Sequence, residues 1–368
     1  MTKRGRRTPR GSGEPSAAFE AEVLPGLAPF AADELHATGQ AELAAPRGAP
    51  ERADAVPFTW RGPRAPLEAL RTVTSVQRRM AFDVPRPKAL LGAEHAAAIR
   101  DELQRVRREA AAPFHGLRLE AAGRDTPVMR RLRAALADAA GLPDDVEKGD
   151  LQVRVRPSPG GARASGWEVL IRLTPRPLSA RSWRVANLPG GLNACVAAAA
   201  WRWLGRAPED RVLNAMCGSG TLLIERAASG PAARLVGIDR DPQALAAARA
   251  NLQAAGVRAE VHEADATSAP FPDASFDVVV ADPPWGDAVG DVRELERLYA
   301  AFLREAARLT SPGGRLLVVT HALSAFDAAL AAADTDWRSE GTLRVFHGGH
   351  RPALHRLRRR RGRGRGSP

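Results

Sequence analysis

The stretch Ser275-Phe276-Asp277-Val278-Val279-Val280-Ala281-Asp282-Pro283-Pro284-Trp285-Gly286 joins an apolar, β-branched run to an acid and two prolines. The run predicts a buried strand. Because proline lacks the N–H that a central strand donates, the backbone must leave the sheet at Asp282. In open α/β sheets, ligands bind at this carboxyl edge. Asp282, Pro283, Pro284 and Trp285 are therefore candidate catalytic residues, offering a carboxylate, a fixed carbonyl and a flat ring to a small planar group.

The same region of the chain alternates regularly between short apolar strands and helices. Strands are predicted at 212–213, 234–238, 258–262, 278–280 and 315–320, with helices at 222–228, 242–255, 293–309 and 325–332 between or after them. Such alternation predicts an α/β fold with a parallel, doubly wound sheet. Two terminal strands are expected at 342–346 and 353–357, paired across His347-Gly348-Gly349-His350.

The first predicted strand runs into a Gly-x-Gly turn at Gly218 and Gly220. Glycines allow close approach of the backbone to a ligand, and the N–H groups of the following helix face it. A dinucleotide site would require a third glycine where this chain has Leu223, so a cofactor without a phosphate fits better. The candidate cofactor-binding residues of this segment are Asn214, Met216, Cys217, Gly218, Ser219, Gly220 and Thr221.

Acids follow the next two strands. Asp239 is placed to accept both hydroxyls of a ribose, whereas Asp241 is expected to cap the following helix. Asp265 is a candidate acceptor for an adenine amino group. With Asp282, which also counts among the cofactor-binding candidates, polar groups end four strands of the predicted sheet.

Charge is unevenly distributed along the 368 residues, whose net charge is +12. Residues 1–10 carry five cations, residues 351–368 carry eight arginines, and residues 71–184 hold 22 cations against 13 acids. The middle segment indicates a phosphate-backbone partner. Two predicted strands, 151–156 and 167–173, have outward arginines, which suit either a nucleic-acid surface or plain solvent-facing charge.

The composition argues against a disulfide-rich, metal-binding, secreted or membrane-spanning protein. Cys195 and Cys217 are the only cysteines, and the histidines lack ligand spacing, so we expect neither a disulfide framework nor a metal site. The basic start lacks the apolar segment of a secretory signal, and no apolar run approaches the roughly 20 residues of a membrane span. These features predict a cytoplasmic protein without a membrane partner.

The motifs Asn214–Thr221, Asp239, Asp265 and Asp282–Trp285 resemble class I S-adenosylmethionine-dependent methyltransferases. Met216-Cys217-Gly218-Ser219-Gly220-Thr221 is similar to the narrower group that carries a ferredoxin-like region and a THUMP domain and methylates guanine N2, mostly in tRNA. The resemblance implies a disordered basic tail at 1–16, a ferredoxin-like α+β region at 17–85 and a THUMP RNA-binding domain at 86–178. A linker at 179–190, a Rossmann-like methyltransferase domain at 191–357 and an arginine-rich tail at 358–368 would follow.

The resemblance also implies a mechanism. Asp282 and the Pro283 carbonyl would hold the guanine amino group, Trp285 would stack on the base, and the THUMP region and basic tails would bind RNA. Two positions depart from the family pattern, because Asn214-Ala215 replaces Asp-Pro and Trp285 replaces Tyr or Phe. The alternatives are guanine-N2 methylation of 23S rRNA, adenine-N6 methylation of nucleic acid, and a non-catalytic RNA-binding protein with a degenerate methyltransferase domain.

Overall fold

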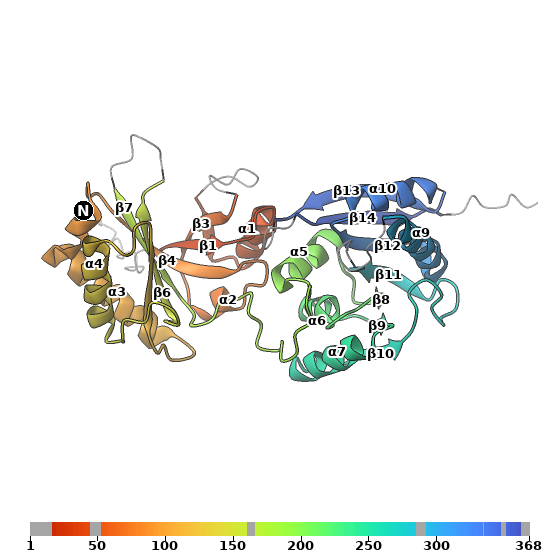
Figure 1. Cartoon of the computed structure of the whole chain (residues 1–368), viewed down its shortest axis with the longest axis horizontal. Helices are drawn as coiled ribbons and strands as arrows, with labels where there is room; N and C mark the ends of the chain where they lie inside the picture. Colours follow the sequence, from red (N-terminus) through yellow and green to blue (C-terminus); the bar gives the residue numbers. More distant parts are fainter. Residues whose placement is uncertain are drawn as a thin grey trace, which may run out of the picture.

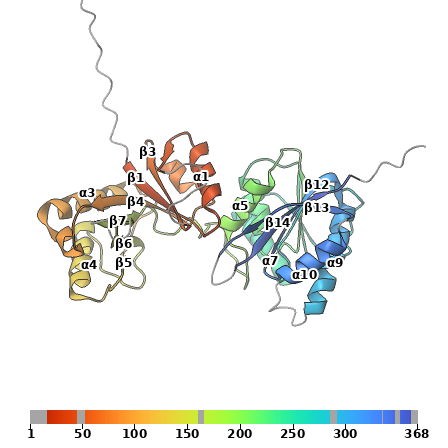
Figure 2. The same ribbon diagram turned by 90° about the horizontal axis from the view of Figure 1, so that it is seen from above.

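The computed structural model describes residues 17–44, 53–159, 166–284, 292–333, 335–346 and 351–361, and these form two halves, each built on a seven-stranded sheet. Figure 1 shows the two halves side by side along the long axis, and Figure 2 shows the same arrangement from above. Among the described residues, no helix combines the length and apolarity that crossing a membrane requires. Several predicted features lie outside the described residues: the tail at 1–16, residues 160–165 between the predicted strands 151–156 and 167–173, Trp285, His347–His350, and residues 362–368 of the arginine-rich tail.

The N-terminal half contains one sheet with the strand order β2-β3-β1-β4-β7-β6-β5. β4 pairs with β7 in antiparallel register, so the predicted ferredoxin-like region and the predicted THUMP region share one continuous sheet and one apolar core. The elements of this half are β1 (Ala17–Glu22), α1 (Ala28–Ala37), β2 (Ala41–Leu43), β3 (Ala55–Trp60), α2 (Ala65–Glu68), β4 (Ser75–Phe82), the 3-10 helix η1 (Pro87–Leu91), α3 (Ala93–Glu109), β5 (Leu117–Ala121), α4 (Pro127–Ala140), β6 (Leu151–Pro157) and β7 (Trp167–Arg172).

Local signals account for the best-predicted elements of this half. The sequence predicts an extended segment at 55–60 and a helix at 127–140, and β3 and α4 have these bounds. The Thr126 hydroxyl caps α4 by accepting from Met129 N, and Gly141 ends the helix in the left-handed conformation. The sequence also predicts a helix over 65–72, but α2 ends at Glu68. The reason is tertiary, because the backbone N–H groups of Arg71 and Thr72 both donate to the Glu34 carboxylate.

The arginines on β6 do not form the open basic face that the alternation allowed. Arg156 donates to both Glu20 and Glu168, and Arg154 donates to Glu22 and to Glu120 of β5. Acids on neighbouring strands therefore neutralise these cations within the sheet. Both earlier interpretations, a nucleic-acid surface and plain solvent-facing charge, are wrong for this pair of arginines.

The C-terminal half is a largely parallel sheet with the order β10-β9-β8-β11-β12-β14-β13. β13 and β14 pair with each other in antiparallel register, as the sequence predicts, and β14 also pairs with β12. The elements are α5 (Ala194–Leu204), β8 (Arg211–Ala215), α6 (Thr221–Ala228), β9 (Arg234–Asp239), α7 (Pro242–Ala254), β10 (Glu260–Glu263), β11 (Phe276–Ala281), α9 (Val292–Leu309), β12 (Thr310–Thr320), α10 (Leu323–Ala332), β13 (Trp337–Arg344) and β14 (Ala353–Arg359). β14 thus continues two residues into the segment predicted as a tail.

Both faces of this sheet are covered, which explains the continuous apolar strands. On β11, Val278 and Val280 pack in a core with α5, whereas Val279 between them packs in a core with α9 and α10. Helices α5, α6 and α7 therefore lie on one face, and α9 and α10 lie on the other (Figure 1).

The order of the strands reverses between β8 and β11. From β8 the chain adds β9 and then β10 on one side, and β11 with β12 on the other. In the parallel pairing of these two central strands, Val280 lies opposite Asn214. A crevice forms at such a switch point, outside the carboxyl ends of the strands. The fold therefore brings the predicted Gly-x-Gly turn and the predicted proline elbow to the same place.

Candidate active site

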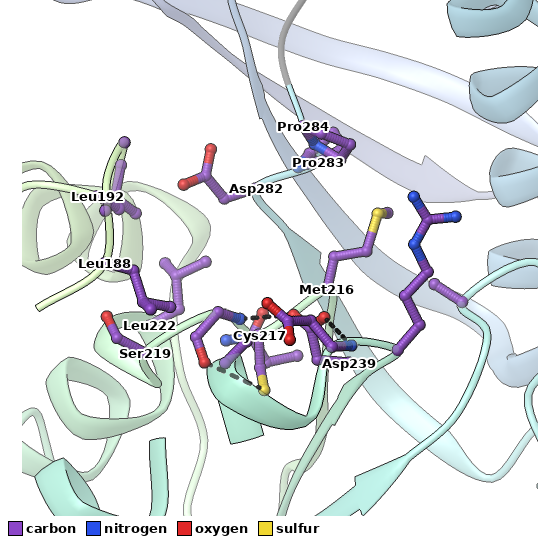
Figure 3. A pocket seen from close by; sticks show the side chains of 18 of the residues that line it. Leu188, Leu192, Met216, Cys217, Ser219, Leu222, Asp239, Asp282, Pro283 and Pro284 are labelled. Carbon is purple, nitrogen blue, oxygen red and sulfur yellow. Dashed lines mark hydrogen bonds between the residues drawn. The ribbon is translucent and has the colours of Figure 1, made fainter. Parts of the chain in front are cut away.

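A cavity of about 670 Å³ occupies the switch point. Figure 3 shows Asp282 across the cavity from Ser219, Cys217 and Asp239, with Leu188 and Leu192 on one side. All the predicted site residues that the structure describes line this cavity except Gly220. The lining comprises Leu188, Pro189, Gly190, Gly191, Leu192, Asn214, Met216, Cys217, Gly218, Ser219, Thr221, Leu222, Asp239, Arg240, Asp241, Ala244, Ala264, Asp265, Ala266, Asp282, Pro283, Pro284 and Leu298.

The turn after β8 has an unusual backbone. Gly218 and Gly220 have φ angles of 52° and 81°, which residues other than glycine rarely adopt. Gly220 leads directly into α6. Met216 also has a positive φ, 58°, although it is not a glycine. Non-glycine residues in this region of φ/ψ space concentrate at functional sites. This backbone conformation supports the prediction that the turn wraps closely around a ligand.

The acid after β9 orders this turn from the neighbouring strand. Asp239 Oδ2 accepts a hydrogen bond from Gly218 N over 2.9 Å, and its Oδ1 accepts from Asp241 N over 3.1 Å. A carboxylate has about four acceptor positions, so Asp239 retains capacity for hydroxyl groups in the cavity. Asp241 caps α7 by accepting from Gln243 N, which confirms the role predicted for it.

Asp265 lies after β10 on the same edge. Its Oδ1 accepts from both the hydroxyl and the backbone N–H of Thr267, each over 2.7 Å. These bonds lower the pKa of Asp265, because they favour the charged form. The side chain is therefore an ionised acceptor at the wall of the cavity.

Asn214 is the clearest sign that the cavity receives a polar ligand. Asn214 is 1% exposed. Neither its amide oxygen nor its amide nitrogen has a hydrogen-bond partner among the described residues. A buried amide without partners is costly, and native proteins rarely contain one unless something else satisfies it. Because Asn214 lines the cavity, a ligand with both a donor and an acceptor would complete its hydrogen bonding.

Asp282 and the two prolines end β11 at the mouth of this cavity. Asp282 is half-buried. Burial raises the pKa of Tyr299 of α9, and the charge of Asp282 raises it further. The Tyr299 hydroxyl lies 2.7 Å from the Thr320 hydroxyl. β11 ends as predicted where the prolines begin. Trp285, the remaining candidate of the elbow, is outside the described residues, so its stacking role stays a prediction.

The cysteine in the turn is not a reactive group. Burial raises the pKa of the Cys217 thiol to about 12, and it does the same for Cys195 of α5. A nucleophilic cysteine requires the opposite shift. Within the described ranges, no cluster of three or more histidine, cysteine or acidic side chains has the geometry of a metal site.

Sequence reasoning missed the wall formed by residues 188–192, most of which was assigned to a linker. The preceding residues anchor this wall to α6, to α7 and to the turn after β8. Arg184 donates to the Thr221 hydroxyl and to the Leu192 carbonyl, each over 2.9 Å. Asn251 of α7 is fully buried, accepts from the backbone of residues 185 and 186, and donates to the Ser219 carbonyl. No local pattern in the Pro- and Gly-containing segment reveals these long-range contacts.

Comparison with known proteins identifies the family and the fold of the chain. Residues 181–353 match the family model described as the UPF0020, RMKL-like, methyltransferase domain. The chain is 34% identical over 246 residues to a protein of Thermus thermophilus named tRNA (guanine(6)-N2)-methyltransferase, and the match covers 66% of each chain. The chain belongs to this methyltransferase family. S-adenosyl-L-methionine is the cofactor of class I methyltransferases, and the cavity has carboxylates and an unsatisfied amide that fit its ribose and amino-acid groups.

Further relatives of the methyltransferase agree with this assignment. A Bos taurus protein named tRNA (guanine(6)-N(2))-methyltransferase THUMP3 is 29% identical over 185 residues, and this chain spans only 37% of its length. The crystal structure of TrmN from Thermus thermophilus aligns with a TM-score of 0.69 and 28% identity, over 93% of this chain and 99% of that one. A putative methyltransferase complexed with SAH, at 14% identity and a TM-score of 0.65, shares the fold.

Proposed function

We propose that this methyltransferase transfers a methyl group from S-adenosylmethionine to the exocyclic N2 of a guanine in tRNA. The observation that carries the proposal is the position of Asp282-Pro283-Pro284, which ends β11 at the switch point beside the cavity that Asn214 lines. The names of the Thermus and Bos relatives support guanine N2 and tRNA over the adenine and rRNA alternatives. Binding of tRNA by the N-terminal half, the THUMP assignment of that half and a cytoplasmic location belong to the same proposal.

In the proposed complex, the cofactor occupies the cavity. Asp239 accepts hydrogen bonds from the ribose hydroxyls, and Asp265 accepts from the adenine amino group. Asn214 bonds to the methionine end, where its amide can donate to a carboxylate and accept from an ammonium group. The backbone of Met216, Cys217, Gly218, Ser219, Gly220 and Thr221 encloses the remainder. No phosphate-binding cluster of cations lines the cavity, which contains Arg240 as its one described cation.

The chain's contribution to transfer is chiefly positional. When bound, the cofactor supplies an electrophilic methyl group. Asp282 accepts one N–H of the guanine amino group and the Pro283 carbonyl accepts the other, which orients the nitrogen lone pair toward that methyl group. Alignment of this kind can contribute several kcal/mol, roughly 7–11 in favourable intramolecular reactions. A guanine within a paired stem must first be flipped out of its stack.

The direct test is to identify the product. We expect purified protein with S-adenosylmethionine to convert guanosine to N2-methylguanosine in unmodified tRNA, as detected by nuclease digestion and mass spectrometry. Equal amounts of rRNA fragments and single-stranded DNA serve as competing substrates. Formation of N6-methyladenosine alone would refute the guanine assignment, and preferential modification of rRNA would refute the tRNA assignment. Failure to bind the cofactor at millimolar concentration would support the non-catalytic alternative.

A further inference from the structure

Glu225 of α6 lies at the junction between the two halves, outside the cavity. Its side chain is completely buried, with 0% exposure. It accepts from Arg71 Nε over 2.7 Å and from Arg71 Nη2 over 2.9 Å, and it also accepts from Arg181 Nε over 2.9 Å. Arg71 belongs to the N-terminal half, whereas Arg181 belongs to the connector. One carboxylate therefore joins three segments of the chain.

A second carboxylate holds the other side of the same loop. Glu34 of α1 accepts from Thr72 N and from the Thr72 hydroxyl, and its second oxygen accepts from Arg202 of α5 over 3.0 Å. Arg181 Nη2 also donates to the Arg71 carbonyl. The loop after α2 is thus bonded through its backbone and its side chain, from both the N-terminal half and the methyltransferase domain.

The geometry of these hydrogen bonds restricts how the two halves can be oriented relative to each other. A bidentate pair between a guanidinium and a carboxylate fixes the plane of both groups, whereas an apolar contact permits sliding. The Arg181 side chain is 7% exposed, so loss of the Glu225 charge would leave a buried cation without its partner. The junction therefore favours one relative orientation of the two halves over nearby ones.

Helix α6 connects this junction to the cavity. Thr221 begins the helix, lines the cavity and accepts from Arg184, and Glu225 follows it by four residues. Residues four apart lie on the same face of a helix. Arg181 and Arg184 of the connector therefore contact one face of α6, and the helix that begins at the cofactor turn also carries the junction carboxylate.

We propose that Glu225 is a positioning residue that, through Arg71 and Arg181, fixes the N-terminal sheet at one orientation to the methyl-transfer cavity. It thereby determines which nucleotide of an RNA bound to the N-terminal half reaches Asp282. The consequence for RNA rests on the function proposed above, whereas the fixed orientation does not. Glu225 does not line the cavity, so its replacement affects delivery of the RNA and not the affinity for the cofactor.

The orientation can be measured without any activity. Spin labels on Asp125→Cys in the N-terminal half and Ala254→Cys in the methyltransferase domain, both exposed positions, report the distance between the halves. Cys195 and Cys217 are buried and will not compete for the label. We expect a single narrow distance distribution in the otherwise unchanged protein and a distribution at least twice as broad in Glu225→Gln. A narrow, unshifted distribution in the variant would overturn the proposal.

Activity supplies the second measurement. Glu225→Gln should raise the KM for tRNA at least tenfold and lower the fraction of methyl groups that are transferred to a single nucleotide position. The Kd for S-adenosylmethionine should stay within twofold of that of the unchanged protein. Glu209→Gln, an exposed position with the same change of charge, is the matched control and should alter neither quantity. Unchanged KM and unchanged position in Glu225→Gln would refute the role in delivery.

A further variant protects the test against misfolding. Arg71→Gln removes the partner that is 29% exposed and leaves Arg181 bonded to Glu225, so its effect should be smaller and in the same direction. If Glu225→Gln does not fold, a broadened distance distribution in Arg71→Gln supports the proposal and an unchanged one overturns it. If the unchanged protein methylates no RNA, the proposed function fails, and the distance measurement still decides the orientation.

Discussion

Arg184 Nη2 donates to the hydroxyl of Thr221 over 2.9 Å, so a connector arginine holds the first residue of the helix that follows the cofactor turn. The same nitrogen donates to the Leu192 carbonyl, which places the connector against the cavity. A segment without regular secondary structure thereby becomes a wall of the cofactor site.

Arg184→Ala should weaken cofactor binding. Hydrogen bonds from a charged donor contribute about 1.5–3 kcal/mol, so we expect the Kd for S-adenosylmethionine to rise about tenfold or more by isothermal titration calorimetry. Arg100→Ala, an exposed change on α3, is the control for loss of one arginine. Equal affinity in the two variants would show that the wall keeps its position without Arg184.

Asn214→Leu should separate stability from binding. In the free protein the change removes a buried amide that has no partner among the described residues, and so it removes a desolvation cost of about 1–3 kcal/mol. We expect a Tm equal to or above that of the unchanged protein, together with at least tenfold weaker cofactor binding. A lower Tm with unchanged affinity would mean that Asn214 is a packing residue.

Asp282→Ala should slow methyl transfer strongly and leave the binding of cofactor and tRNA nearly unchanged. The proposed bond to the amino group is used mainly in the reactive pose, and loss of one such group costs about 10²- to 10³-fold in kcat. Single-turnover transfer to tRNA and calorimetric titration of the cofactor measure the two effects separately. Asp273→Asn, 79% exposed, should behave as the unchanged protein does. Normal turnover in Asp282→Ala would reduce the elbow to a strand terminator.

Both cysteines should resist thiol reagents while the protein is folded. Burial raises the pKa values of Cys195 and Cys217 to about 12, so the thiolate form is negligible at pH 8. We expect no reaction with a chromogenic disulfide in buffer and reaction of two thiols per chain in denaturant. Rapid modification of the native protein would contradict the closed packing around the turn.

Asp277 should make stability depend on acid pH. Arg211 bonds both oxygens of this carboxylate and lowers the pKa of Asp277 to about 2. Because the folded pKa lies below the unfolded one, the contribution is complete above about pH 4 and disappears as pH falls toward 2. Since both groups are over a third exposed, we expect Asp277→Asn to cost about 1 kcal/mol or less at pH 7 by urea denaturation. A cost that is the same at pH 3 and pH 7 would assign it to packing.

The cofactor edge was predictable because its signals are local. β-branched runs followed by Gly-x-Gly, by an acid or by Pro-Pro indicate both a strand and its end, and Asn214, Asp239, Asp265 and Asp282 all meet at one cavity. In the N-terminal half, the strand at 55–60 and the helix at 127–140 were predictable for the same reason. In these cases the residues that determine the structure are neighbours in sequence.

Contacts between distant segments were not predictable. The arginines of β6 pair with Glu20 and Glu22, which are more than 130 residues away in the sequence. No local sequence pattern distinguishes such a paired arginine from one that faces RNA. The bonds of Asn251 to the connector span 65 and 66 residues. Such pairs depend on how the elements assemble, which no periodicity in one sequence encodes.

The pairing of β4 with β7 has a consequence for dividing the chain into fragments. A fragment that stops at the predicted boundary after residue 85 would expose the long edge of β4 from Gln77 to Phe82, which β7 covers in the whole chain. Unprotected edges of this kind recruit other strands and cause aggregation. Expression of the N-terminal half for RNA-binding work therefore requires a fragment that extends through Arg172, whereas a shorter one would precipitate or associate with copies of itself.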